Sequence, residues 1–231
     1  MSQARPNVHE PSERGSALPT SRPSAKSGDE SPHSKALRAV SQRAAQTLKW
    51  LEQARQDILS PSLDHLTLGR AALYAAILES GAGSPLPAAD DSAHSDTERR
   101  ARSDAPYLET ARRELDAAVS GLRHAGQQHY LPLGLLTRAW LRFLTGARTV
   151  PESAQEDLDE SWEIAERGPM KLFLADIHLY RARLFGRKNY PWESPQHDLT
   201  AARKLIEQCG YGRRKEELED AEKAILGHVV L

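Results

Sequence analysis

Three evenly spaced glycines constrain the fold of this chain more than any other feature. The interval from Gly126 to Gly168 equals that from Gly168 to Gly210, and each glycine follows an amphipathic segment. The segments align as LDAAVSGLRHAG, LDESWEIAERG and LTAARKLIEQCG. Self-similarity at a period of about 20 to 50 residues is typical of proteins that stack helical units. Because such stacks form extended concave surfaces, the repeat predicts a binding protein rather than an enzyme.

A second segment of each unit repeats as well. HLTLGRAAL, YLPLGLLTRA and FLADIHLYRA superpose through three leucines, Leu66, Leu131 and Leu174. The step from Leu131 to Leu174 matches the glycine spacing, whereas the step from Leu66 to Leu131 is half as long again. The polar stretch 81–105 accounts for this excess. It is predicted to be a disordered loop insertion in the first unit, because insertions in repeat proteins fall in loops.

The apolar spacing predicts helices along the whole repeat region. They are expected over about residues 34–59, 62–79, 105–124, 130–145, 151–167, 170–185 and 213–226, with a further helix capped by Ser194 and opened by Pro195. Ser60-Pro61 is expected to stop the first helix, and Gly168 to take a left-handed cap conformation. The predicted fold is all-α, a TPR-like α-solenoid of about three helix pairs within residues 35–228. An N-terminal helix and a C-terminal capping helix complete it.

The N-terminal segment 1–34 has too few large apolar side chains to join a core. It includes eight serines, five prolines and no aromatic residue, so residues 1–34 are predicted to be a disordered tail. The four carboxylates in this segment are atypical of a transit peptide. The segment also lacks the apolar stretch that a secretion signal needs.

Charge, cysteine content and hydropathy limit the cellular compartments and the classes of partner that this chain is expected to have. The 31 basic and 32 acidic residues leave a net charge of −1, which gives no general attraction to nucleic acid or to an anionic membrane. No run of about 18 apolar residues could span a bilayer. A single cysteine, Cys209, fits a reducing compartment. The chain is therefore expected to be cytoplasmic and to bind protein.

The C-terminal part of the repeat region resembles a known family. Residues 129–225 contain AERGPM, LADIHLYRARLF, YPWESPQHDLTAARKLIEQCGY and RRKEELEDAE. These sequence segments are similar to the tetratricopeptide-repeat (TPR) region at the C-terminus of bacterial NACHT/STAND-type signalling NTPases. The resemblance implies a TPR-like right-handed superhelix that senses or binds a partner. The glycine spacing is longer than the period of a standard TPR, which is about 34 residues, so HEAT-like helix pairing remains an alternative fold.

The resemblance also implies an alternative function. The chain could be a regulatory or sensor subunit split from such a signalling ATPase, acting in trans with an NTPase chain. It has no G-x-x-x-x-G-K-[ST] loop to hold nucleotide phosphates.

Motifs for catalysis and for metal binding are missing. The sequence has no G-x-S-x-G nucleophile elbow and no H-E-x-x-H zinc motif. Asp90, Asp91, His94 and Asp96 are close in sequence, but they fall in the expected insertion and are interpreted as a solvated loop. We therefore expect no catalytic residue, no metal site and no cofactor.

The first helix of each pair is expected to line the groove of the stack. Arg138 and Arg181 occupy equivalent positions in successive units, and Leu73 is their counterpart in the first unit. Three further basic residues are expected nearby, Arg70, Lys171 and His178. Together they predict a basic groove for an acidic peptide or a C-terminal carboxylate; the alternative is that all five are solvated residues of amphipathic helices. Three aromatic residues are predicted to be core rather than binding residues, Trp140, Tyr180 and Phe185.

Overall fold

The chain is all-helical wherever its structure is described. The computed structural model describes residues 31–54, 57–79, 94–149, 151–186 and 190–227, with the backbone alone over 94–105. Every element in these ranges is a helix, which confirms the predicted all-α class. Most of the expected N-terminal tail lies outside the described residues. Its last residues begin the first helix.

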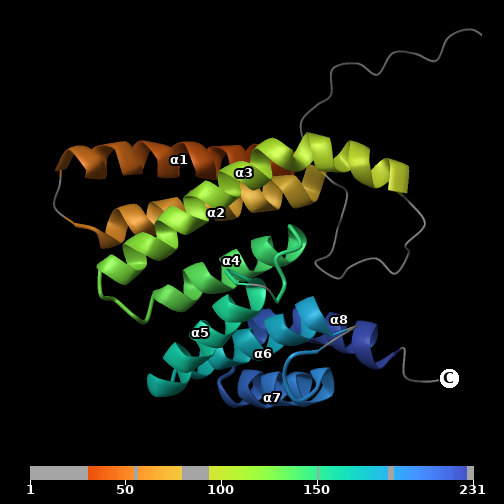
Figure 1. The fold of residues 1–231 in the computed structure, drawn as a ribbon. Helices are drawn as coiled ribbons and strands as arrows, with labels where there is room; N and C mark the ends of the chain where they lie inside the picture. Colours follow the sequence, from red (N-terminus) through yellow and green to blue (C-terminus); the bar gives the residue numbers. More distant parts are fainter. Residues whose placement is uncertain (1–30, 55–56, 80–93, 150, 187–189, 228–231) are drawn as a thin grey trace, which may run out of the picture. The chain divides into compact units, whose positions relative to one another are not determined.

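Eight α-helices and one short 3-10 helix make up the described part (Figure 1). They are α1 (Pro32–Ala54), α2 (Leu59–Glu79), α3 (His94–His124), α4 (Leu131–Leu144), α5 (Ala154–Arg167), α6 (Lys171–Phe185), α7 (Pro195–Gln208), η1 (Gly212–Arg214) and α8 (Lys215–Leu226). From α4 onward, the starts and ends agree closely with the sequence-based prediction.

Two boundaries near the N-terminus differ from the prediction. Ser60-Pro61 does not stop a helix but lies in the first turn of α2, where proline is tolerated because its missing N–H would have no partner. The Asp57 carboxylate caps this turn, accepting bonds from the backbone N–H groups of Leu59 (2.9 Å) and Ser60 (3.0 Å). Residues 94–105 of the expected loop insertion form the first part of α3, and residues 81–93 lie outside the described residues.

The three repeated glycines do not share one conformation. Gly126 and Gly210 have φ angles of 67° and 62°, in the left-handed region that favours glycine. Gly168 has a φ of −92°, so the expected left-handed cap at this position is wrong.

The helices pack against their sequence neighbours and form two rows. Each helix from α1 to α8 contacts the next one along the chain, and α2, α4, α6 and α8 also contact one another in series. We call α2, α4, α6 and α8 the first-helix row, and α3, α5 and α7 the second-helix row. This arrangement of sequence-adjacent pairs can be followed in Figure 1.

The core lies between the two rows. Leu115, Val119 and Leu122 on α3 are at most 1 % exposed, as their predicted stripe requires. On α8, the narrow stripe of Leu218, Ala221 and Ile225 packs against residues of α6 and α7. Four charged residues of α8 are exposed, Lys215, Glu216, Asp220 and Lys223, as expected of a capping helix.

Serine caps fix where α5 and α7 begin. The Ser153 hydroxyl accepts a hydrogen bond from the Glu156 N–H, and the Glu156 side chain accepts one from the Ser153 N–H, which completes a capping box. The Ser194 hydroxyl accepts from the His197 N–H at 3.0 Å, and Pro195 opens α7 as predicted. Because each start is fixed, the residues that follow each serine occupy equivalent positions.

The crossing of α2 and α3 depends on a glycine. A Cβ atom added to Gly69 would lie 2.7 Å from Cγ of Leu115 and 3.2 Å from its backbone nitrogen. Since Leu115 is fully buried, it has little room to move. Gly69 therefore permits a close approach of two backbones that any larger residue would oppose.

We predict that Gly69→Ala lowers the free energy of unfolding. The gain in helix propensity is about 1 kcal/mol, whereas overpacking a filled core costs about 1 to 3 kcal/mol, so a net loss is expected in urea denaturation. Gly212→Ala is the control, because a Cβ there would meet nothing within 4 Å. Equal stability of Gly69→Ala and the parent protein would contradict the close crossing.

Candidate binding groove

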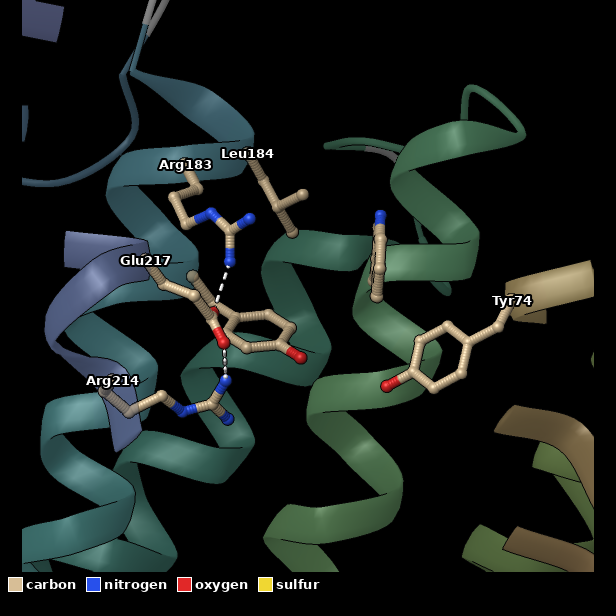
Figure 2. A pocket seen from close by; sticks show the side chains of 7 residues that line it. Tyr74, Arg183, Leu184, Arg214 and Glu217 are labelled. Atoms are coloured by element: carbon tan, nitrogen blue, oxygen red, sulfur yellow. Dashed lines mark hydrogen bonds and ion pairs between the residues drawn. The ribbon is translucent and has the colours of Figure 1, made fainter. Parts of the chain in front are cut away.

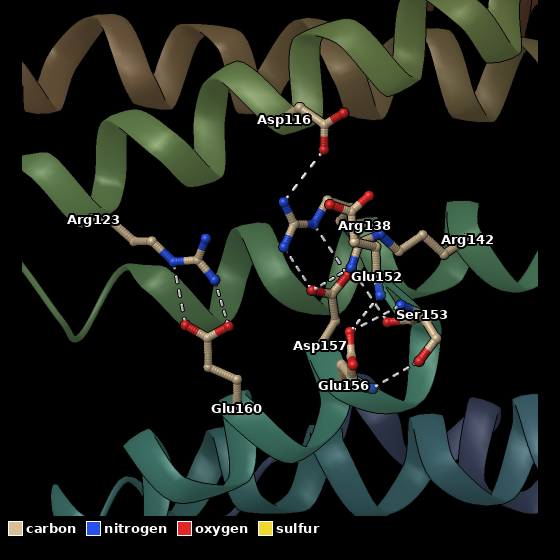
Figure 3. A network of polar contacts seen from close by, with 9 residues as sticks. All are labelled: Asp116, Arg123, Arg138, Arg142, Glu152, Ser153, Glu156, Asp157 and Glu160. Carbon is tan, nitrogen blue, oxygen red and sulfur yellow. Dashed lines mark hydrogen bonds and ion pairs between the residues drawn. The ribbon is translucent and has the colours of Figure 1, made fainter. Parts of the chain in front are cut away.

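Arg138 and Arg181 occupy equivalent structural positions, but both are buried. Arg138 is 8 % exposed and Arg181 7 %. The Arg138 guanidinium donates from Nη2 and Nε to the Asp157 carboxylate at 2.7 and 3.1 Å, and from Nη1 to Asp116 at 3.3 Å. Figure 3 shows Arg138 between Asp116 on α3 and Asp157 on α5. Arg138 thus ties one helix of the first row to two helices of the second.

Arg181 repeats part of this arrangement one unit later. Its Nη2 donates to Asp159 on the preceding second-row helix at 3.1 Å, as Arg138 does to Asp116. Its guanidinium carbon lies 4.7 Å from the ring centroid of Trp162 and 4.5 Å from that of Trp192. Two indole faces therefore contact this cation, an arrangement that stabilises a desolvated guanidinium.

A buried aspartate follows each capping serine at the same distance. Asp157 stands four residues after Ser153 and Asp198 four residues after Ser194, and both carboxylates are nearly inaccessible. Asp198 pairs with the His178 ring, whose Nδ1 lies 2.6 Å from Oδ1. His178 therefore also faces α7 and is 6 % exposed. Burial raises the pKa of Asp157, although Arg138 and Arg142 act in the opposite direction.

The structure consequently separates the five sequence-predicted groove residues. Arg138, His178 and Arg181 face the second-helix row. Each contacts an internal carboxylate, and Arg181 also packs against aromatic rings. Lys171 is exposed in the first turn of α6. Of the five, Arg70 lines one of the two cavities described below, where its Nε donates to the Thr137 hydroxyl and its Nη2 to the Leu133 carbonyl, both at 3.0 Å.

Two adjoining cavities lie along the first-helix row, and we call them together the inner groove. One, of about 280 Å³, is lined by Tyr74, Trp140, Tyr180, Arg183, Leu184, Arg214 and Glu217. The other, of about 290 Å³, shares Tyr74, Tyr180, Arg214 and Glu217 with the first. It adds Arg70, Leu133, Leu136, Thr137, Asp176 and Arg213. Every lining residue comes from α2, α4, α6 or the η1–α8 segment.

The inner groove carries an excess of positive charge. Its lining has four arginines, Arg70, Arg183, Arg213 and Arg214, and two carboxylates, Asp176 and Glu217, which leaves two positive charges over. Such a surface favours an anionic partner, since complementary charge raises both specificity and association rate.

Glu217 joins two of these arginines. Its carboxylate accepts from Arg183 Nη1 and from Arg214 Nη1, both at 2.6 Å. Figure 2 shows Glu217 between the two guanidinium groups, with Tyr74 on the other side of the cavity. Arg214 also donates from Nε to Asp176 at 2.7 Å. Burial alone would lower the pKa of Arg214, but Asp176 and Glu217 outweigh it and the pKa is raised.

Two side-chain donors beside the aromatic end of the groove are buried and have no hydrogen-bond partner among the described residues. They are Trp140 Nε1 and Arg183 Nε. A buried donor without a partner costs about 1 to 3 kcal/mol. Burial raises the pKa of Tyr180 to about 12, further above physiological pH than that of an exposed tyrosine.

Sequence reasoning misses most of the groove lining. Trp140 and Tyr180 are expected to be core, and both pack against a core cluster while also lining a cavity. Phe185, at 5 % exposed, is core as predicted. The sequence does contain one indication that Arg138 and Arg181 point inward. Their counterpart on α2 is a leucine, Leu73. This leucine is fully buried, as is typical of a position that faces the partner helix.

Comparisons with known proteins identify no relative of this chain. No family model, curated protein or solved structure matches the chain. The resemblance to the TPR region of NACHT/STAND-type proteins, and the trans-acting partnership with an NTPase that it implies, stay predictions.

The described residues contain neither a metal cluster nor a membrane span. Within these ranges no three His, Cys, Asp or Glu side chains gather in a way that could hold a metal ion. The cluster at residues 90–96 lies outside the described side chains. In the same part of the chain, no helix is both long and apolar enough to cross a membrane.

We predict that the two carboxylates around Arg138 differ sharply in importance. Asp157→Ala leaves a buried guanidinium without its main partner and should cost about 3 to 5 kcal/mol in the free energy of unfolding. The Asp116 side chain is 45 % exposed, so Asp116→Ala should cost less than about 1 kcal/mol. Urea titrations followed by circular dichroism measure both. Similar losses for the two variants would show that Arg138 does not depend on Asp157.

Proposed function

We propose that the chain is a non-catalytic protein-interaction module, a TPR-like solenoid whose inner groove binds an acidic segment of a partner protein. The observation that carries the proposal is the composition of the groove. Both cavities are lined only by the first-helix row and η1, and their arginines outnumber their carboxylates by four to two. Stacked helix pairs characteristically use such a surface for extended ligands.

The groove is suited to an extended peptide by its reach across helices. Arg70 stands on α2 and Arg213 on η1, so the basic lining runs from the first unit to the C-terminal cap. Arg213 is exposed, and its Nη2 donates to the Tyr211 hydroxyl at 2.6 Å. A peptide carboxylate can therefore reach this guanidinium without displacing an internal carboxylate from it.

The two carboxylates of the groove are held by its own cations, which favours binding over catalysis. Asp176 is buried and engaged by Arg214 and Tyr211, and Glu217 is engaged by two arginines. Neither carboxylate is positioned as an available general base, which needs access to a substrate proton.

A peptide-display selection against the full chain tests the proposal. Selected peptides should be enriched in aspartate and glutamate, and their affinity should fall as NaCl is raised from about 0.05 to about 0.5 M, because exposed charges are screened. Arg213→Glu should weaken binding by more than about tenfold. Arg70→Glu, which changes a groove residue on α2, should weaken binding as well.

Arg167→Glu is the matched control. Arg167 is exposed on α5, outside the groove, and its Nε donates to the Glu163 carbonyl of its own helix. Its replacement changes net charge by the same amount and should leave peptide affinity within about twofold. Selection of neutral or basic peptides, or equal losses in Arg213→Glu and Arg167→Glu, would refute an acidic-peptide groove.

A further inference from the structure

We propose that the end of the inner groove formed by Tyr74, Trp140 and Tyr180 is a subsite for an aromatic side chain of the partner segment. In this proposal the Arg183 guanidinium binds a carboxylate next to that side chain. The inference rests on the proposed function and specifies which residues the acidic segment must contain: an aromatic residue beside an aspartate or glutamate.

Three rings from three helices meet at this end of the groove. Tyr74 comes from α2, Trp140 from α4 and Tyr180 from α6, and all three line the same cavity. The Tyr74 and Trp140 ring centroids are 5.7 Å apart with an interplanar angle of 56°. Tyr74 is 40 % exposed. A large aromatic side chain is thus left open to solvent beside a cavity, where it can pack against an incoming ring.

The cavity has room for that ring. Its volume is about 280 Å³, whereas an apolar cavity of about 150 Å³ suffices to bind benzene in another protein. A phenylalanine or tyrosine side chain therefore fits, and space remains for the polar atoms that accompany it.

The Arg183 side chain lines the cavity beside the rings. Trp140 Nε1 and Arg183 Nε are both buried without a partner among the described residues. Glu217 accepts from Arg183 through Nη1, which leaves Arg183 Nη2 to donate to a ligand. A planar guanidinium binds carboxylates through paired donors. A carboxylate adjacent to the bound ring would accept from Arg183 Nη2.

The occupant is a peptide rather than a free aromatic acid, because the cavity continues beyond the rings. The second cavity shares Tyr74, Tyr180, Arg214 and Glu217 with the first and extends to Arg70 and Arg213. One small molecule fills a single end of this space. A peptide with further carboxylates can occupy both cavities.

Isothermal titration calorimetry of the full chain with matched synthetic peptides tests the subsite. The probe is a blocked acidic pentapeptide with a central phenylalanine, and its twin has alanine at the centre. We expect the phenylalanine peptide to bind about tenfold more tightly than its twin. In Tyr74→Ala this advantage should disappear, while Tyr107→Ala, which changes an exposed tyrosine of α3 outside the groove, should retain it.

A second pair of peptides tests the role of Arg183. Replacing the glutamate next to the phenylalanine by glutamine should weaken binding to the parent protein by about tenfold. The same replacement should have no effect on binding to Arg183→Gln. If the glutamine peptide binds the parent protein as tightly as the glutamate peptide, Arg183 does not bind the adjacent carboxylate.

The remaining outcomes separate the two proposals. If both the phenylalanine and the alanine peptides bind equally and both are lost in Arg213→Glu, the aromatic subsite is wrong and the acidic groove stands. If neither peptide binds, both proposals are contradicted. Phenylacetate that binds as tightly as the phenylalanine peptide would overturn a peptide occupant in favour of a small aromatic acid.

Discussion

The buried pair between Arg138 and Asp157 is the interaction on which the arrangement of the helix rows depends. It joins α4 to α5 at a point where both side chains are almost inaccessible to water. A buried ion pair adds little net stability over an apolar pair of the same size. Its importance lies in selectivity, because any register that separates Arg138 from Asp157 leaves a charge unpaired in the interior. The capping box at Ser153 fixes where α5 begins and so places Asp157 opposite Arg138.

This constraint explains where the inner groove lies. Each helix of the first row presents one face to the second row, where Arg138, His178 and Arg181 are held by carboxylates or rings. The opposite face of the same helices carries Trp140 and Tyr180 and lines the cavities. One set of cations therefore faces the second-helix row, and a different set, on α2, α6 and η1, lines the inner groove.

Sequence periodicity predicts the helices well because it reports burial directly. The apolar stripes of α3 and α8 are buried as expected, and Ser194 caps α7. The equivalence of Arg138 and Arg181 is also correct. Their predicted direction is wrong, because a basic residue on an amphipathic helix is expected to face solvent. Arg138 and His178 point inward because each pairs with a buried aspartate, four residues after Ser153 and Ser194 respectively. Each aspartate belongs to a different helix from the residue it pairs with. Pairing across helices cannot be deduced from the pattern of one helix.

Mapping the bound peptide on the protein tests the central claim most directly. Backbone amide chemical shifts can be followed while a selected acidic peptide is added to the full chain. Binding in the inner groove predicts the largest changes around Tyr74, Trp140, Tyr180 and Arg213, with small changes along α3, α5 and α7. The largest changes on the exposed faces of the second-helix row, with the inner groove unaffected, would contradict the account.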